Sequence, residues 1–461
     1  MASRQNPQLA LLVLASCAVT AAAAADFGLD TSFGDNGIVR VGDEHTDSSG
    51  LLLVQPDGHI TTCAVNHDSS GHTTATLYRF DVDGVPEAAF GGGGHITLPS
   101  NDRNAQCRAL AMQGDARVIV ATTGISPVTH DLETQVFRVD DDGALDANFG
   151  ESGVAHVDIQ IDAAEFVQTM LVHDDNILIC APLSFTVAVE RLDANGVHDG
   201  TFGVGGRQAI PLAQFGISRV INGCGMAVDA SGRVVVSGSL AFDTVNVTNM
   251  SATTRVLVDG TPDTSFGTNG ISTFGVPDHS TQVFPILPDS AGRLIEFGFV
   301  ATGAGIAFSN EALAVARLDS DGTPDASFGS GGISVLRIHD ADIFDAARYG
   351  VIEPDGKLLV IGSAQHADGS ARGVFLQLDA SGQPDPGFGV GGVVELSLTS
   401  DGLGFTGISA VARQGAGLVF SANVLEPADT YFHQYLVRAA SDSASAPPAA
   451  RGHSHHRRAA L

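Results

Sequence analysis

The sequence predicts an all-β fold: a seven-bladed β-propeller with four antiparallel strands per blade, closed by an N-terminal strand that completes the last blade. Three observations predict it. A Phe-Gly motif recurs seven times, a second turn motif also recurs seven times, and the two ends of the chain carry complementary fragments of one repeat. Self-similarity at a nearly fixed period indicates that each repeat is one supersecondary unit.

The Phe-Gly motif returns at intervals of 53 to 64 residues. In every copy an acidic residue stands three positions before the Phe, and a second Gly stands four positions after it. The seven aromatic residues are Phe33, Phe90, Phe149, Phe202, Phe266, Phe328 and Phe388. We interpret the Phe as a core side chain and its glycines as positions with backbone angles that other residues rarely adopt.

Residues 350–398 show the strands of one repeat. Four short runs rich in Val, Leu and Ile are separated by Gly, Asp and Pro, which is the signature of strands. Asp355-Gly356 between the first two runs is a tight hairpin signal, and the third and fourth runs flank the Phe-Gly motif. The hairpin turn has a counterpart in each of the seven repeats, at 56, 114, 173, 230, 290, 354 and 415. Four such strands, repeated about every 60 residues, are typical of propeller blades.

The two ends of the chain each supply part of one repeat. The N-terminal part begins at a Phe-Gly motif and supplies only a fourth strand, at 38–41. The C-terminal part supplies only the first three strands, at 408–411, 418–422 and 435–438. We therefore expect strand 38–41 to pair with strand 435–438, because this pairing removes an exposed sheet edge. The propeller would span residues 26–440.

The segments outside the repeats have other compositions. Residues 1–25 carry Arg4, an apolar run and then small residues, which is the layout of a cleaved signal peptide. Leu14-Ala15-Ser16-Cys17 offers an alternative, an N-terminal lipid anchor at Cys17. The product would be exported to the periplasm, the cell surface or the medium. Residues 441–461 form a His- and Arg-containing tail that lacks the apolar content to order itself. Its His453, His455 and His456 offer an alternative metal-binding tail. No transmembrane span is predicted after the signal peptide.

Four cysteines follow the signal peptide, and their spacing indicates pairing. Cys63 and Cys107 are 44 residues apart, as are Cys180 and Cys224. In an oxidising compartment this favours two disulfides, each joining one repeat to the next. Four buried thiols are the alternative. A cysteine metal site is disfavoured because no C-x-x-C pair exists.

The net charge of −29 restricts the class of partner. Such an acidic surface repels phosphate backbones, so no nucleic-acid partner is expected. The absence of Trp and the presence of only four Tyr weaken a carbohydrate-stacking platform. An envelope or extracellular protein, or a glycan, remains the expected partner, and we expect a monomer.

In each blade the first-to-second and third-to-fourth turns lie on one face of the ring, here called the repeated face. The second-to-third connections and the links between blades lie on the opposite, variable face. Their sequences differ, as at 65–74, 122–134, 239–253 and 302–311. Because function tends to lie on loops held by a rigid scaffold, we expect the variable face to be the binding face.

Three links between blades on the variable face place histidine beside carboxylates. The candidate binding residues are His45, His279, and His339 with Asp340 and Asp342. Convergent His and Asp side chains can hold a transition metal or provide acid–base chemistry. Chance proximity in an acidic protein is the alternative.

No cofactor is predicted, and the catalytic residues are unknown. The Asp-rich turns at 140–142 and 319–321 contain oxygens suited to calcium, but such carboxylates also bond the N–H groups of their own turn, which we favour. An Arg eleven residues before the Phe in five copies indicates a repeated structural contact with turn carboxylates or carbonyls. No G-x-S-x-G, H-E-x-x-H or P-loop sequence occurs.

The PDGK turn at 354–357 and the segment RLDSDGTPDASFGSGGI from Arg317 resemble the bacterial delta-60 repeat family, over residues 29–438. The first half of each repeat is also similar to NHL-type propeller blades. The resemblance implies an exported or surface bacterial protein, and it carries over no catalytic residue. The first functional hypothesis is a non-enzymatic binding scaffold of the envelope. The alternative is a hydrolase or lyase with a metal near the mouth of the central channel.

Overall fold

A computed structural model describes most of the chain between residues 28 and 439, together with one short segment before it. The described residues are 12–13, 28–43, 45–68, 70–99, 103–114, 116–126, 130–157, 167–183, 186–211, 219–241, 249–277, 279–302, 309–339, 344–366, 370–396, 404–415, 417–425 and 432–439. Apart from Leu12 and Val13, the predicted signal peptide lies outside them, as do the lipidation site at Cys17 and the C-terminal tail. No helix among these residues is long and apolar enough to cross a membrane.

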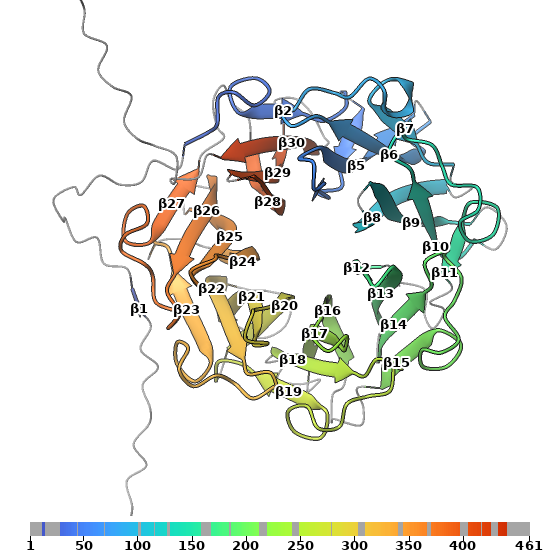
Figure 1. The fold of residues 1–461 in the computed structure, drawn as a ribbon. Helices are drawn as coiled ribbons and strands as arrows, with labels where there is room; N and C mark the ends of the chain where they lie inside the picture. Colours follow the sequence, from blue (N-terminus) through green and yellow to red (C-terminus); the bar gives the residue numbers. More distant parts are fainter. Residues whose placement is uncertain are drawn as a thin grey trace, which may run out of the picture.

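Seven sheets stand side by side in a ring, each radiating from the centre (Figure 1). Blade 1 contains β3 (Thr46–Ser48), β4 (Leu53–Val54), β5 (Ile60–His67), β6 (Thr73–Phe80) and β7 (His95–Thr97), and blade 2 contains β8 (Arg103–Gln113), β9 (Arg117–Ile125), β10 (Leu132–Val139) and β11 (Ala155–Val157). Blade 3 contains β12 (Thr169–His173), β13 (Asn176–Leu183), β14 (Thr186–Leu192) and β15 (Arg207–Pro211), and blade 4 contains β16 (Arg219–Val228), β17 (Val234–Ala241), β18 (Asn249–Val256) and β19 (Ile271–Phe274).

The remaining blades follow the same order. Blade 5 contains β20 (Ser280–Pro288), β21 (Leu294–Thr302), β22 (Ser309–Leu318) and β23 (Ile333–Arg337), and β1 (Leu12–Val13) lies parallel to β23. Blade 6 contains β24 (Phe344–Ile352), β25 (Leu358–Gln365), β26 (Ala371–Leu378) and β27 (Val393–Leu396). Blade 7 contains β28 (Gly404–Gln414), β29 (Gly417–Leu425), β30 (Phe432–Ala439) and β2 (Ile38–Arg40). The short 3-10 turn η1 spans Phe90–Gly92.

The seven-bladed, four-stranded antiparallel fold predicted from the repeats is confirmed. Strands on the variable face run further than the sequence suggested. For example, β9 and β10 stay paired as far as Ile125 and Leu132, inside the connection expected at 122–134. The apolar residues of β9 and β10 end before the turn, but the two strands remain paired through polar residues.

The ring closes as the end fragments predicted. Strand β2 pairs antiparallel with β30, with Ile38 opposite Val437 and Arg40 opposite Tyr435. The backbone N–H of Val41 also donates to the Gln434 carbonyl, at 2.9 Å. Figure 1 shows this N-terminal strand beside the C-terminal one. The outer edge of β30 is therefore covered by a strand from the opposite end of the chain.

The hydrophobic core lies between the blades. Seven clusters of buried side chains fill the seven interfaces between neighbouring sheets, including the one between blade 7 and blade 1. Each sheet thus packs apolar side chains from both of its faces against its two neighbours.

The Phe-Gly motif connects each blade to the next. The ring of Phe328 is fully buried, and a Cβ on Gly382 of blade 6 would lie 2.9 Å from it. Gly329 has a φ of +55°, and its N–H donates to the Ser381 carbonyl of blade 6 at 2.8 Å. The motif therefore needs one glycine for backbone conformation and another, in the next blade, for close packing.

The repeated arginine completes this junction. The Nε of Arg317 donates to Asp325 at 2.7 Å, and its Nη1 donates to the Ala380 carbonyl of blade 6 at 2.7 Å. Its guanidinium lies 4.5 Å from the centroid of the Phe328 ring. The same contact to the next blade is made by Arg79, Arg138, Arg191, Arg255 and Arg438. The structural interpretation of this arginine is confirmed.

Both disulfides join neighbouring blades. Cys63 on β5 is bonded to Cys107 on β8, and Cys180 on β13 is bonded to Cys224 on β16. The pairing expected from the equal spacing is therefore present, between blades 1 and 2 and between blades 3 and 4.

Candidate functional site

The repeated face uses its polar side chains to hold the ring together. In the turn of blade 5, Asp321 accepts hydrogen bonds from the N–H and hydroxyl of Thr323, at 2.9 and 2.7 Å. Hydrogen bonds from Ser327, supported by Arg317, lower the pKa of the Asp325 carboxyl. In blade 2, the Asp142 carboxylate accepts the N–H of Ala144 at 2.9 Å. Asp142 and Asp321 thus have partners within their own turns, whereas Asp141 pairs with Arg79 of blade 1.

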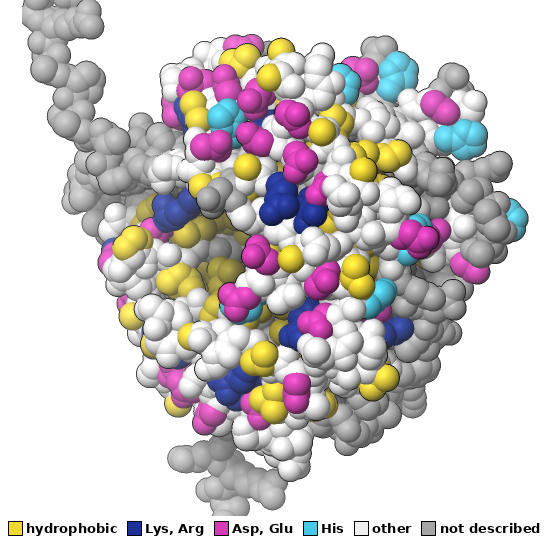
Figure 2. Space-filling view, turned by 45° about the vertical axis from the view of Figure 1, so that its right-hand side comes forward, with side chains coloured by type: hydrophobic (Ala, Val, Ile, Leu, Met, Phe, Trp, Pro, Cys, Tyr) yellow, Lys and Arg dark blue, Asp and Glu magenta, His cyan; other side chains and the backbone are white. Residues whose placement is uncertain are grey.

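The surface as a whole is acidic. Figure 2 shows Asp and Glu side chains spread over the visible side, with smaller groups of Lys and Arg among them, as the net charge of −29 requires. Two hollows on the repeated face are lined by turn residues, one around 262–273 and 322–324 and one between blades 3 and 4. The second includes Arg191 and Asp229, which pair with Asp199 and Arg233.

The predicted histidines do not meet in one place. Each follows the outermost strand of a different blade, with His45 after β2, His279 after β19 and His339 after β23. The Nδ1 of His45 lies 4.0 Å from Asp43, and the Nδ1 of His279 lies 2.8 Å from the Pro277 carbonyl oxygen. Asp340 and Asp342 lie outside the described residues.

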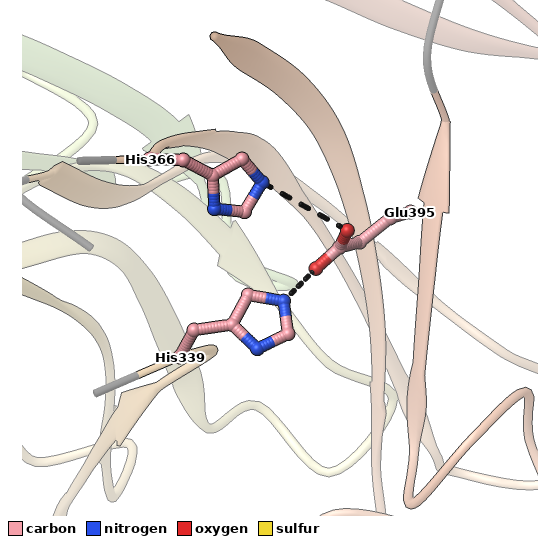
Figure 3. A group of neighbouring side chains, drawn as sticks. All are labelled: His339, His366 and Glu395. Atoms are coloured by element: carbon pink, nitrogen blue, oxygen red, sulfur yellow. Dashed lines mark hydrogen bonds and ion pairs between the residues drawn. The ribbon is translucent and has the colours of Figure 1, made fainter. Parts of the chain in front are cut away.

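His339 instead meets two residues of blade 6 that the sequence did not single out (Figure 3). His366 directly follows β25, and Glu395 lies on β27. The Nε2 of His339 is hydrogen-bonded to the Oε1 of Glu395. The Nε2 of His366 lies 4.0 Å from Oε2 of the same carboxylate. Among the described residues, this is the one group of three or more His, Cys, Asp or Glu residues whose ligand atoms gather closely enough for a metal ion.

The group lies at the variable-face end of blades 5 and 6, near the rim. Glu395 is on the outermost strand of blade 6, and His339 follows the outermost strand of blade 5. The metal considered in the sequence-based alternative was expected near the central channel mouth, so the described His–carboxylate group is elsewhere. Two imidazoles and a carboxylate are, however, a ligand set that zinc uses in catalytic sites with one open position.

A small apolar cluster supports these three side chains from below. Ile338, Ala364 and Val374 are buried together, next to Val393. Ile338 precedes His339, Ala364 is two residues before His366, and Val374 is the cross-strand partner of Glu395. The N–H of Ile338 also donates to the buried Asp345 carboxylate, at 3.1 Å. The backbone at all three ligand positions is thus fixed by packing.

Two buried carboxyls elsewhere have raised pKa values. Burial raises the pKa of Glu296, on β21, to about 8, against a smaller lowering by the Thr253 hydroxyl. Burial also raises the pKa of Glu311, on β22, to about 7, while Arg348 lowers it. Glu296 lies between blades 4 and 5, where its carboxyl accepts a hydrogen bond from the Thr253 hydroxyl.

The chain matches a family described as "Domain of unknown function (DUF5122) beta-propeller" at residues 300–328 and 353–388. The first segment carries the end of β21 and the third strand of blade 5 up to Phe328, and the second carries the second and third strands of blade 6 up to Phe388. No curated protein matches the chain.

Solved propellers match the fold at low identity. One is the polysaccharide lyase Uly1, with 10% identity, a TM-score of 0.50 and coverage of 88% of this chain and 93% of that one. Another is Sqt1 from Chaetomium thermophilum, with 12% identity, a TM-score of 0.46 and coverage of 87% and 97%. At such identities the likeness concerns the fold alone. The chain is a β-propeller built from sequence repeats.

Proposed function

We propose that this chain is an exported binding or interaction scaffold that contacts an envelope or extracellular protein, or a glycan, through its variable face. The observation that carries the proposal is the division between the two faces. The repeated Phe and Arg side chains contact the next blade, and the repeated Asp holds the Arg. The described strand ends that lead into the loops that differ between blades lie on the other face.

Export is supported by three features. Two disulfides join neighbouring blades, and disulfides persist in oxidising compartments. The first 25 residues have the composition of a signal peptide. The resemblance of the repeats to the delta-60 family points the same way. The disulfides and the propeller fold are compatible with the periplasm, the cell surface and the medium alike.

A metal-dependent hydrolase or lyase is the second candidate function, favoured by the group of His339, His366 and Glu395. Bound zinc with an open position would polarise a substrate oxygen or activate water. No nucleophile or general base beyond these ligands is assigned, so the scaffold remains the first proposal.

Site-specific photo-crosslinking in envelope extract tests the scaffold. Exposed apolar side chains occur on both faces, which provides positions for comparison. Ile125 and Phe432 are exposed on the variable face, while Val204 and Val390 are exposed at Phe-Gly turns on the repeated face. A photoreactive amino acid at each position should yield one adduct of defined mass from the variable face only. Adducts from the repeated face alone, or none from either, would refute the assignment of the binding face.

A further inference from the structure

We infer that His339, His366 and Glu395 form a binding site for one divalent transition metal ion of the zinc class, with a fourth position open to solvent. The site extends the second candidate function, but it does not depend on catalysis. A protein that holds a metal for structure or for partner binding would use the same three ligands.

The donor atoms already lie close to the spacing that zinc needs. All three ligand atoms are within 4.8 Å of one another. Ligands bound to zinc at about 2.1 Å in a tetrahedron lie roughly 3.4 Å apart, so binding requires the side chains to bring their donor atoms closer together. The rings of His339 and His366 are 5.3 Å apart, centroid to centroid, so the two imidazoles are neighbours.

Exposure also suits a metal that reaches the site from solvent. The His339 side chain is 52% exposed, whereas Glu395 is 22% and His366 is 18% exposed. Two ligands are therefore held against the protein, and the third can move at the surface. Figure 3 shows the two rings on the same side of the carboxylate.

The backbone positions of the ligands are set in advance. Ile338, Ala364 and Val374 pack together beneath the group, so little order has to be created when the ion binds. The acidic surface around the ring adds a favourable potential for a cation. Arg372 opposes it, because its Nε lies 3.8 Å from Oε2 of Glu395. A divalent ion would compete with this guanidinium for the carboxylate.

Blade 2 offers a matched control. His156 and Glu133 form a similarly close His–carboxylate pair on the two outer strands, with side chains 50% and 31% exposed. Within the described part of the chain this pair belongs to no group of three ligands. It tests whether an exposed His–Glu pair alone accounts for binding.

In the experiment, the purified full-length protein is titrated with Co²⁺, and binding is detected by the visible d–d absorption of the bound ion. Zn²⁺ is then added to displace the bound Co²⁺. Every protein in the comparison carries His453→Ala, His455→Ala and His456→Ala, so that the tail histidines cannot bind the metal. Variants His366→Ala and Glu395→Gln are compared with His156→Ala, and the metal-free Tm of each variant reports its folding.

We expect one equivalent of Co²⁺ in the parent and in His156→Ala, with an intense spectrum that indicates four-coordination and is removed by Zn²⁺. His366→Ala and Glu395→Gln should each weaken binding about tenfold or more at an unchanged metal-free Tm, since even outer partners of metal ligands are worth that much. Binding that is absent in the parent, or that survives in both ligand variants, overturns the site. Stoichiometric metal without any hydrolase or lyase activity would retain the site and reject only the enzyme.

Discussion

The ammonium group of Lys357 lies 2.7 Å from the carboxylate of Asp385, and it forms the ion pair that the repeated arginine makes with this carboxylate position in blade 5. In blade 6 that arginine is replaced by Gln377. In blade 5 the residue equivalent to Lys357 is Arg293, which lies 3.8 Å from Asp325 while Arg317 makes the close contact. The hairpin turn thus supplies the cation that the third strand of blade 6 lacks.

This relationship predicts a rescue. Lys357→Met should lower the stability by about 1 kcal/mol or less, because the pair is partly exposed. Adding Gln377→Arg to this variant should restore most of the loss by recreating the Arg317–Asp325 arrangement. The same Gln377→Arg change in the parent should give a smaller gain, since the two cations share one carboxylate. Urea unfolding of the four proteins measures the cycle, and strictly additive effects would contradict the shared role.

Ring closure predicts that residues 26–42 are needed for stability. Deleting them exposes the outer edge of β30 and removes Phe33, whose buried ring contacts Gly84 of blade 1 and lies 4.8 Å from the Arg438 guanidinium. We expect a strongly lowered Tm and a tendency to aggregate through the open edge. A synthetic peptide of residues 26–42 should raise the Tm again in a concentration-dependent way. An unchanged Tm after deletion would contradict the closure.

The disulfides predict a measurable loss of stability when they are reduced. Each closes a loop with a sequence separation of 44 residues, and a native disulfide of this kind contributes about 2–4 kcal/mol. The double variants Cys63→Ala/Cys107→Ala and Cys180→Ala/Cys224→Ala should each lower the urea midpoint, and reducing agent should then affect each variant less than the parent. Equal sensitivity to reducing agent in the parent and in both variants would show that it acts elsewhere.

Glu296 predicts a pH dependence of stability. Its pKa is about 8 when folded and near the ordinary 4.5 when unfolded, so the folded state keeps a proton that the unfolded state has lost between these values. The contribution of Glu296 to the free energy of unfolding is highest below about pH 4.5. It declines as the pH rises toward 8, by up to about 1.4 kcal/mol per pH unit. Glu296→Gln should remove this decline.

The measurement is the free energy of unfolding at pH 5 and pH 8 for the parent, Glu296→Gln and the exposed control Glu151→Gln. The difference between Glu296→Gln and the parent should grow in favour of the variant as the pH rises. Parallel pH profiles for these two proteins would show that Glu296 is not the responsible group.

Most of the fold could be predicted from local patterns. Each Phe-Gly motif can be recognised as a turn from the sequence, because two of its positions require glycine. Gly329 has a positive φ, and a Cβ on Gly382 would collide with the ring of Phe328. The cysteine pairs could be predicted from equal spacing, because both pairs join the second strand of one blade to the first strand of the next. The lengths of the strands could not be predicted, because the polar ends of β9 and β10 stay paired although no hydrophobic pattern indicates it.

The candidate site could be predicted only in part. His339 stood out because carboxylates follow it in the sequence, but its partners in the fold are His366 and Glu395. These are 27 and 56 residues further along the chain, and neither belongs to a repeated position. Their meeting depends on how far apart two blades stand and on where each strand ends.

By itself, the sequence determined the number of blades, the closing strand and the disulfide pairs, because each of these is written in a repeated local pattern. The tertiary structure decided which unrepeated side chains meet. It joined His339 to blade 6, left His45 and His279 in other blades, and gave Asp385 a lysine in place of the missing arginine. The physical reason is that repeats encode contacts made in every blade, whereas a site formed once depends on the relative placement of two sheets.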